Sequence, residues 1–334
     1  MHRIISVLAL TLSMLLASSA RADKLVLVAG GGTEIENVPA TQAKLNQPFG
    51  VDFDKAGNMY IVELKGNRVL KVDAKGILTF LGGTGETGSS GDRGPARSAT
   101  FNGMHSLAVG PDGLLFLADT WNNRIRRLDP KSGMVDAFAG VGGKKPYAGD
   151  DGPAAKAQFG GIYCVAFDFK GSKLLITDLD NRRIRAIDLK SGTVQLVAGN
   201  GKKGVPMDGA DAKTAPLVDP EGKIRTVVGV SGKAGNTGDD GDARQATLNG
   251  PKHLCVDPDD NVIIADSANH VIRKYSPKDK KIVRLAGTGK KGDSGNGGDP
   301  LQVALYEPHG VTVSPAGVLF IVDSLNHRIF RWEK

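Results

Sequence analysis

The stretch FNGMHSLAVGPDGLLFLADTWNNRIRRLD, from Phe101 to Asp129, decides the fold because variants of it recur along the chain. Each copy has a short apolar run, a turn centred on Gly or Asp, a second apolar run that ends in an acid, a polar turn and a third apolar run. Runs of this length joined by tight turns are typical of β-strands in hairpins. The counterparts of the stretch begin at Gln47, Phe159, Gly250 and Glu307.

A fourth apolar run follows in some copies, as in VQLVAG from Val194 and KIVRLAG from Lys281. Four short strands in a repeated unit predict the blades of a β-propeller. The spacing between units is 56 to 58 residues, except that one unit has only 31. We therefore expect an all-β chain of five full blades plus a remnant, with units that start near Leu45, Phe101, Phe159, Leu217 (truncated), Leu248 and Leu305.

The two ends of the chain predict how the ring closes. The last unit stops at Lys334, just after its third strand, whereas KLVLVAGGG from Lys24 to Gly32 matches a fourth-strand run. We expect this N-terminal strand to pair with the last blade, because a closed ring leaves no exposed sheet edges.

The truncated unit passes directly from Leu217 to EGKIRTVVG (Glu221 to Gly229), which matches a fourth strand, so its first three strands are missing. We favour a six-blade plan with an incomplete fourth blade, which would leave the strands around Val165 and Leu254 facing solvent. Two alternatives remain. The ring closes as five with 217–247 as a long excursion, or the chain is a deletion variant that folds poorly.

The N-terminal residues have the pattern of a targeting segment. Met1-His2-Arg3 is followed by an apolar run from Ile4 to Leu16 and by Ala20-Arg21-Ala22. A basic end, a short apolar core and an A-x-A site are typical of a secretory signal peptide, and a membrane anchor is the alternative. We expect removal of 1–22, a single propeller domain over 23–334 with no transmembrane span, and export to the periplasm or the extracellular space.

The distribution of charge indicates which classes of partner to expect, and the positions of the cysteines indicate whether a disulfide forms. The formal net charge is +7 and falls to about +5 without Arg3 and Arg21, and the basic residues are spread over all units. A single basic patch is therefore not expected, which makes nucleic acid an unlikely partner. Cys164 and Cys255 occupy different columns of non-adjacent units, so we expect two free, buried cysteines and no disulfide.

The units resemble NHL repeats in three motifs: P-x-G-[VL]-x-[VF]-D, [LY]-x-[IL]-x-D and N-[RH]-[RV]-[IV]. The resemblance covers nearly all of 24–332 and implies a propeller. NHL propellers act as protein-binding modules, RNA binders, extracellular sensor domains and enzymes, so the resemblance does not fix the function.

One column of the repeat differs from unit to unit. It is the residue that begins the first strand, and because first strands line the central channel, these side chains are expected to converge at the channel mouth. They form the candidate ligand-binding site: Phe49, His105, Tyr163, Lys252 and His309, with His253 one position later.

FNGMHSLAVGP and EPHGVTVSP also resemble segments of the peptidyl-hydroxyglycine amidating lyases, which are NHL propellers that hold zinc by three histidines from alternate blades. The resemblance implies His105 and His309 as metal ligands. The third would fall on the truncated unit, and His253 could replace it only if the ring contracts. Zinc sites in enzymes keep three protein ligands, and Gly310 stands where the lyases have aspartate. We therefore favour a channel without metal.

Other recurring polar residues fit turns. The acids that end the second strands and the Asn that follows them (Asp119 with Asn123, Asp178 with Asn181) are expected to bond the intervening turn, and the next Arg to bond those acids or carbonyls. GDDGPAAKAQF from Gly149 and GDDGDARQATL from Gly238 carry spaced carboxylates that calcium could bind, but too few of them for a defined loop. No nucleophile elbow, phosphate loop or CxxC occurs.

Two functions are compatible with these features. The favoured one is an exported scaffold without a cofactor, which binds a protein, a glycan or a small ligand through loops on one face and through the channel mouth. The alternative is a lyase or hydrolase that depends on zinc or calcium, with a site built from His105 and His309.

Overall fold

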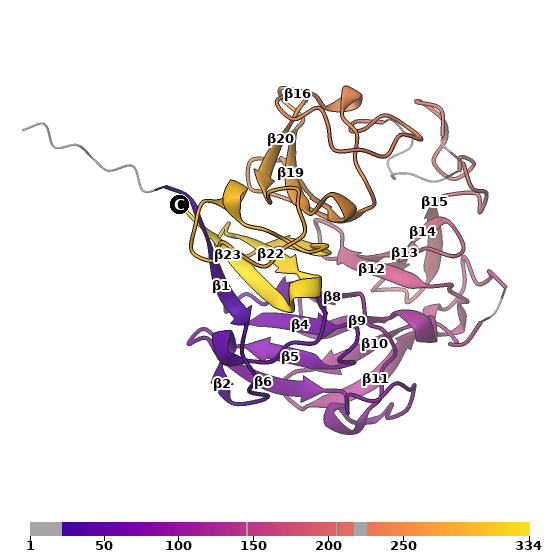
Figure 1. Ribbon diagram of the computed structural model, residues 1–334. Coiled ribbons are helices and arrows are strands. Elements are labelled where there is room, and N and C mark those ends of the chain that lie inside the picture. The colour runs from indigo at the N-terminus through magenta and orange to yellow at the C-terminus, as the bar shows by residue number, and fades with distance from the viewer. Residues whose placement is uncertain (1–21, 145, 205, 217–225) are drawn as a thin grey trace, which may run out of the picture.

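The computed structural model describes residues 22–144, 146–204, 206–216 and 226–334. These residues form five antiparallel sheets, each a blade in which three or four successive strands follow one another outward from the inner strand (Figure 1). In four of the five sheets the outermost strand comes from a point earlier in the chain than the inner strand. Of the expected fold, the all-β propeller with five full blades is confirmed. The predicted signal peptide lies outside the described residues except for Ala22.

Each blade is named here by its inner strand. The first blade has β2 (Val38–Pro39), β3 (Pro48–Phe53), β4 (Met59–Glu63), β5 (Val69–Val72) and β6 (Ile77–Gly82). The second has β7 (Gly94–Pro95), β8 (Ser106–Val109), β9 (Leu115–Asp119), β10 (Arg124–Asp129) and β11 (Met134–Ala139). The third has β12 (Ile162–Phe167), β13 (Lys173–Asp178), β14 (Arg183–Asp188) and β15 (Val194–Ala198).

The remaining two blades follow the truncated unit. The β17 blade has β16 (Gly241–Asp242), β17 (Pro251–Val256), β18 (Val262–Asp266), β19 (Val271–Ser276) and β20 (Lys281–Ala286). The β21 blade has β21 (Gly310–Val313), β22 (Leu319–Asp323), β23 (Arg328–Glu333) and β1 (Lys24–Gly30). Short 3₁₀ turns complete the fold: η1 (Ala40–Gln42), η2 (Ala96–Ser98), η3 (Thr120–Asn122), η4 (Ala154–Lys156), η5 (Ala243–Gln245), η6 (Ser267–Asn269), η7 (Pro300–Gln302) and η8 (Ser324–Asn326).

The N-terminal strand is the outermost strand of the last blade. β1 runs antiparallel to β23, with Leu25 opposite Trp332 and Ala29 opposite Ile329, and the two strands lie side by side in Figure 1. Leu25, Ile329 and Phe330 are buried. Lys24–Gly30 and Arg328–Glu333 therefore lie in one sheet, which is the pairing that the sequence predicts.

The acid that ends each second strand fixes the start of the first strand in the same blade. The Asp119 carboxylate accepts the amide N–H of Asn102 at 2.8 Å, and Glu63 accepts that of Asn46 at 2.7 Å. The side-chain amide of Asn122 also donates to Asp119. Asp119 and Asn123 were expected to bond the backbone of the turn between them. This is wrong for this blade, because Asp119 bonds Asn102 and Asn122, and Asn123 adopts a left-handed conformation (φ 56°) and accepts the Gly161 N–H of the next blade.

Buried arginines hold the long loops that the sequence singled out for calcium. Arg185 is fully buried, donates to the carbonyls of Gln158 and Ala148 at 2.8 and 3.0 Å, and pairs with Asp150 at 2.8 Å. Arg273 and Asp239 repeat the arrangement in the β17 blade. Because these loop carboxylates face guanidinium groups, the geometry fits turn scaffolding.

A second recurring contact joins neighbouring blades. In each of these contacts the donor is a backbone N–H near the start of the inner strand of one blade. The acceptor is a side chain of the preceding blade, on the left-handed residue that ends the turn between its second and third strands. These pairs are Asn67 with Gly103, Asn123 with Gly161, His270 with Glu307 and His327 with Gln47. In the β12 blade this position is Arg182 (φ 49°), whose side chain has no acceptor, and the next unit is the truncated one.

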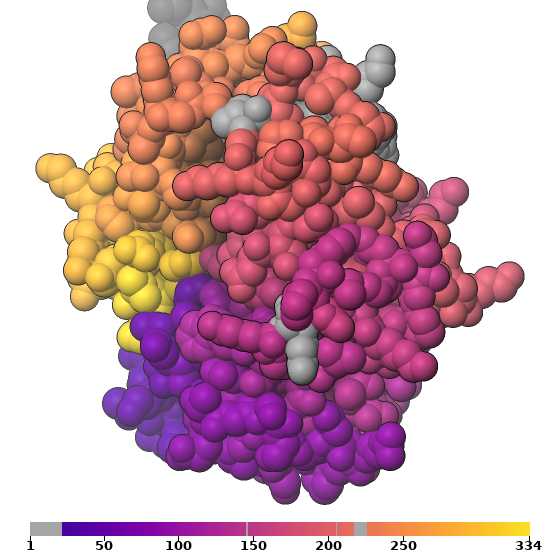
Figure 2. Space-filling model, turned by 90° about the vertical axis from the view of Figure 1, so that its right-hand side faces the viewer, coloured from indigo at the N-terminus to yellow at the C-terminus, as the bar shows by residue number. Residues whose placement is uncertain are grey.

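The truncated unit contributes no strand among the described residues, since none lies between Ala198 and Gly241. Of its predicted fourth strand, 221–225 lie outside the described residues and 226–229 are not extended in a sheet. Ala212 and Ala215 pack near Ala198, and Asp208 pairs with Arg244 at 3.1 Å, so this segment bridges the outer parts of the β12 and β17 blades (Figure 2).

The two inner strands that flank the truncated unit, β12 and β17, differ in how much of their side chains is exposed to solvent. Leu254 is 60% exposed and Val256 53%, as expected for a missing neighbour. The same expectation is wrong for Val165, which is only 3% exposed because it faces the β8 blade, where its N–H donates to Ser106.

The contact between blades predicts a pattern of stability. His270→Gly keeps the left-handed backbone but removes the acceptor for the Glu307 N–H, so the free energy of unfolding should fall by about 1 kcal/mol. His270→Asn should lose less, because Asn67 and Asn123 make the same bond in other blades. Urea unfolding of both variants tests this, and an equal loss in the two would contradict it.

Candidate functional site

At one end of the channel, every blade contributes the start of its first strand and the turn between its second and third strands. Backbone bonds tie the two together in each blade, as from the Trp121 N–H to the Asn102 carbonyl at 3.1 Å and from the Leu325 N–H to the Tyr306 carbonyl at 3.2 Å. This end is the channel mouth, and the backbone positions its side chains.

The side chains of the variable column of the repeat, which begins each first strand, contact one another at the channel mouth. The Phe49 ring centroid lies 5.1 Å from that of His105 and 4.1 Å from that of His309, on which it stacks. The His105 ring lies 4.6 Å from that of Tyr163, and Lys252 Nζ is 5.8 Å from the centroid of the Tyr163 ring. The structure thus brings five side chains from five blades into one continuous set of contacts, the mouth cluster.

Both mouth histidines are oriented in the same way. His105 Nδ1 lies 2.8 Å from the Gly103 carbonyl, and His309 Nδ1 lies 2.8 Å from the Glu307 carbonyl. Gly103 and Glu307 both have positive φ, which turns their carbonyls toward the ring two residues later. Because a carbonyl only accepts, Nδ1 carries the proton and Nε2 is the nitrogen with a free lone pair.

The same two imidazoles are neutral over the physiological range. Burial lowers the pKa of His105 to about 4, with a further contribution from the charge of Lys252 and an opposing one from the Gly103 carbonyl. Burial likewise lowers the pKa of His309 to about 4. The mouth cluster therefore carries its positive charge on Lys252 alone among these five side chains.

Trp121 belongs to the same site, although the sequence analysis did not select it. Its ring lies 5.8 Å from that of His105, it is 50% exposed, and Lys65 Nζ is 5.8 Å from its centroid. A Cβ on Gly103 would lie 2.3 Å from the indole, so this glycine makes room for it. Trp121 stands where other units have Lys65, Asp180, Ala268 and Leu325, and this asymmetry was the available signal.

His253 lies apart from these ring contacts. It points from β17 toward the β21 blade, where its Nδ1 is 3.0 Å from the Val311 carbonyl. Among the described residues no group of three or more His, Cys, Asp or Glu side chains is placed to hold a metal ion. The mouth histidines therefore lack a third ligand, and the residues present do not fit a three-ligand zinc site.

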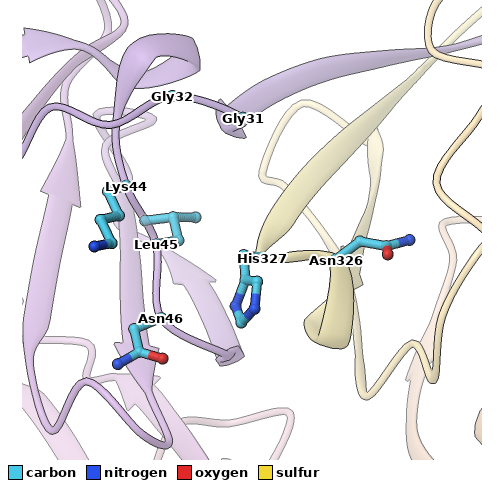
Figure 3. A pocket seen from close by; sticks show the side chains of 7 residues that line it. All are labelled: Gly31, Gly32, Lys44, Leu45, Asn46, Asn326 and His327. Atoms are coloured by element: carbon cyan, nitrogen blue, oxygen red, sulfur yellow. The ribbon is translucent and has the colours of Figure 1, made fainter.

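Two surface cavities lie elsewhere. One of about 480 Å³ lies where the β3 and β21 blades meet, lined by Lys44, Asn46 and His327, and Figure 3 shows the His327 ring standing between the two blades. The other, of about 590 Å³, lies at the opposite end of the channel among the hairpins that carry Lys55, Pro111 and Phe169. No helix in the described part of the chain has the length and apolar character needed to cross a membrane.

The neutral mouth histidines predict a pH-dependent stability. Their folded-state pKa is about 4, below the usual 6.5, so only the unfolded chain gains these protons between the two values. The free energy of unfolding should therefore fall as the pH is lowered through this window. The double variant His105→Gln, His309→Gln should lose less stability there, as measured by urea unfolding. Identical pH profiles for the two proteins would contradict the assignment.

Comparisons with known proteins agree with this architecture. The NHL repeat family model matches residues 248–275 and 305–332. Protein SUPPRESSOR OF QUENCHING 1, chloroplastic, from Arabidopsis thaliana is 28% identical over 282 residues, which cover 73% of this chain and 26% of that protein. NHL repeat-containing protein 2 from Bos taurus is 25% identical over 317 residues, which cover 86% of this chain and 39% of that protein.

The chain thus spans well under half the length of these two relatives. Among solved structures, a gluconolactonase from Xanthomonas campestris aligns with a TM-score of 0.53 at 14% identity, over 93% of this chain and 97% of that one. A likeness at this identity shows the fold alone. The five blades, the recurring motifs and these matches together identify the chain as an NHL-repeat β-propeller.

Proposed function

We propose that this chain is an exported binding scaffold whose ligand site is the channel mouth. The observation that carries the proposal is the mouth cluster, in which five blades each contribute one side chain from the same column of the repeat, and these side chains are of four different types. Side chains that serve the blade itself recur in every unit, as the acids that end the second strands do. The residue that begins the first strand differs from unit to unit, yet its side chains meet in one place. This combination is expected of a ligand-binding site rather than of residues that hold each blade together.

The side chains at the channel mouth restrict the kind of ligand that would bind there. Trp121 is half exposed and offers an aromatic face, and the free Nε2 atoms of His105 and His309 accept hydrogen bonds. Lys252 and Lys65 supply positive charge at the rim. The complementary ligand has hydroxyl or amide donors, an apolar ring face and a negative charge. Such groups occur on acidic glycans and small hydroxy acids, and also on a protein loop.

The plan of the ring and the location of the protein are parts of the same proposal. The unit spacing supports a six-blade plan with an incomplete fourth blade. The pairing of β1 with β23 and the bond from the Gln47 N–H to His327 support closure of the ring at the N-terminal strand. The basic, apolar and A-x-A segments of 1–22 support export to the periplasm or the extracellular space.

A metal-dependent lyase or hydrolase is the second candidate. The observation in its favour is the matched orientation of His105 and His309, since metal-binding histidines often donate their other ring N–H to a carbonyl. Its weakness is the missing third ligand in the described residues. Metal analysis of the purified protein separates the candidates, because stoichiometric zinc or calcium that is lost in His105→Ala and His309→Ala would favour the enzyme.

The binding proposal predicts a ligand-dependent thermal shift. A panel of neutral and acidic monosaccharides, hydroxy acids and short peptides is screened against the wild-type protein, and a compound that binds the folded state raises its Tm. The shift should be lost in Trp121→Ala and in the His105→Ala, His309→Ala double variant. Phe169→Ala at the opposite end of the channel is the matched control and should keep it.

Two outcomes would contradict the proposal. The first is a shift that survives in both mouth variants. The second is a shift that disappears in Phe169→Ala, because the ligand would then bind at the opposite end.

A further inference from the structure

Part of the channel mouth forms a strip of rings with a lysine at each end. The His105 ring lies 5.8 Å from that of Trp121 and 4.6 Å from that of Tyr163, measured between centroids. Lys65 Nζ lies 5.8 Å from the Trp121 centroid, and Lys252 Nζ lies 5.8 Å from the Tyr163 centroid. These five residues, here called the mouth strip, place three rings between two cations.

The mouth strip is open to solvent. Trp121 is 50% exposed, the two lysines are exposed, and His105 and Tyr163 are partly exposed. The Nε2 atom of His105 is free to accept a hydrogen bond, because its Nδ1 is held by the Gly103 carbonyl. A ligand that lies along the strip can therefore stack on the rings, donate to His105 and reach both ammonium groups.

The fold does not use the two lysines of the strip. The cations that hold the long loops are arginines, as in the pairs of Arg185 with Asp150 and of Arg273 with Asp239. Neither Lys65 nor Lys252 forms an ion pair with a carboxylate in the part of the chain that the structure describes. An anion can therefore bind these ammonium groups without breaking a native contact.

Further lysines lie on the same end of the propeller. The loops that follow three of the fourth strands contain Gly-Lys-Lys, and their described lysines are all exposed: Lys144, Lys202, Lys203, Lys290 and Lys291. The Gly143 N–H donates to the Asn122 carbonyl at 3.1 Å, and the Asn326 side chain donates to the Gly292 carbonyl at 2.6 Å. Because both asparagines lie in turns at the mouth, these lysines are spread along the sequence but gathered at one end of the fold.

One of these loop lysines repeats the pairing of a cation with a ring. Lys291 Nζ lies 3.9 Å from the centroid of the Tyr306 ring, which is partly exposed beside the first strand of the β21 blade. Aromatic rings with an ammonium group nearby therefore occur at three places around the mouth, at Trp121, Tyr163 and Tyr306.

The opposite end of the channel has the opposite charge. Its hairpins, between the first and second strands, carry more acids than lysines, the acids being Asp54, Asp112, Asp168, Asp257, Asp259 and Asp260. The lysines of these hairpins are Lys55 and Lys170. A difference in sign between two ends of a protein directs an approaching anion to the positive end.

The distance between the two lysines of the strip restricts the ligand. A small hydroxy acid has a single carboxylate, which reaches Lys65 or Lys252 but not both, because three rings lie between them. A chain of uronic acids carries a carboxylate on each sugar, an apolar ring face that stacks on an aromatic side chain, and hydroxyl donors for His105. A nucleic acid strand has fewer hydroxyl donors, and the export proposed above places the protein among glycans.

We propose that the mouth strip binds an oligosaccharide of uronic acids. Two of its carboxylates pair with Lys65 and Lys252, and the sugars between them lie on Trp121 and Tyr163. The loop lysines extend the positive surface for longer chains. This inference rests on the proposed function, which places the ligand site at the channel mouth, and it specifies the class of ligand.

The experiment is isothermal titration calorimetry with oligogalacturonates from the monomer to the hexamer. The Kd should fall by at least about tenfold between the monomer and the tetramer, because only the longer ligand engages both lysines. A neutral galactose oligosaccharide of the same length should bind at least about tenfold more weakly. Added sodium chloride should weaken binding of the tetramer, as expected for contacts between opposite charges.

Variants of single lysines locate the carboxylate contacts. Lys65→Gln and Lys252→Gln should each raise the Kd of the tetramer by about tenfold. Lys65→Arg keeps the charge and should retain most of the affinity. Lys170→Gln, at the opposite end of the channel, is the matched control and should leave the Kd unchanged.

The outcomes separate this inference from the proposed function. The inference is overturned if the neutral oligosaccharide binds as tightly as the tetramer, if Lys65→Gln and Lys252→Gln bind it as the wild type does, or if a single-stranded oligonucleotide of equal charge binds more tightly. In those cases the proposed function still stands when any compound gives a thermal shift that is lost in Trp121→Ala. If no compound gives such a shift, both fail.

Discussion

The contact between successive inner strands is the constraint on which the structure depends. A single blade cannot bury both faces of its sheet, so each must cover the next. The backbone N–H at the start of one first strand is bound by a side chain of the preceding blade, as Gly103 is by Asn67. This contact sets the spacing of the starts of the first strands, and it thereby determines that Phe49, His105 and Tyr163 meet at one end of the channel.

Most of this architecture could be predicted from the repeat. The strands, their order within a blade and the pairing of Lys24–Gly30 with the last blade follow from matching runs of residues, and the mouth cluster follows from one aligned column. Trp121 was missed because it stands in a turn rather than in that column. The buried Arg126, Arg185 and Arg273 were missed because a charged residue on a strand normally indicates a solvent-facing position.

What the repeat could not predict is the behaviour of the chain where the repeat fails. Pattern matching identifies missing strands but not which surfaces then meet, because that depends on how far the ring contracts. Cys164 appeared to be an inert apolar residue, and His253 a candidate for the mouth. In the structure Cys164 is only partly buried, and His253 lies against the β21 blade, where its Nδ1 is 3.0 Å from the Val311 carbonyl. Leu254 stays exposed, and the segment with Asp208 bridges the outer side.

The central claim, that the first strands of the blades begin together at one end of the channel, is tested most directly by cross-linking. In the double variant Phe49→Cys, His309→Cys, mild oxidation should join the two new cysteines by an intramolecular disulfide that non-reducing peptide mapping detects, because the two wild-type rings stack with centroids 4.1 Å apart. The double variant Phe169→Cys, His309→Cys is the matched control and should not cross-link, because Phe169 lies at the opposite end of the channel. If residues 49 and 309 formed no disulfide, or if residues 169 and 309 did, the first strands would not begin at a common mouth and the account would be wrong.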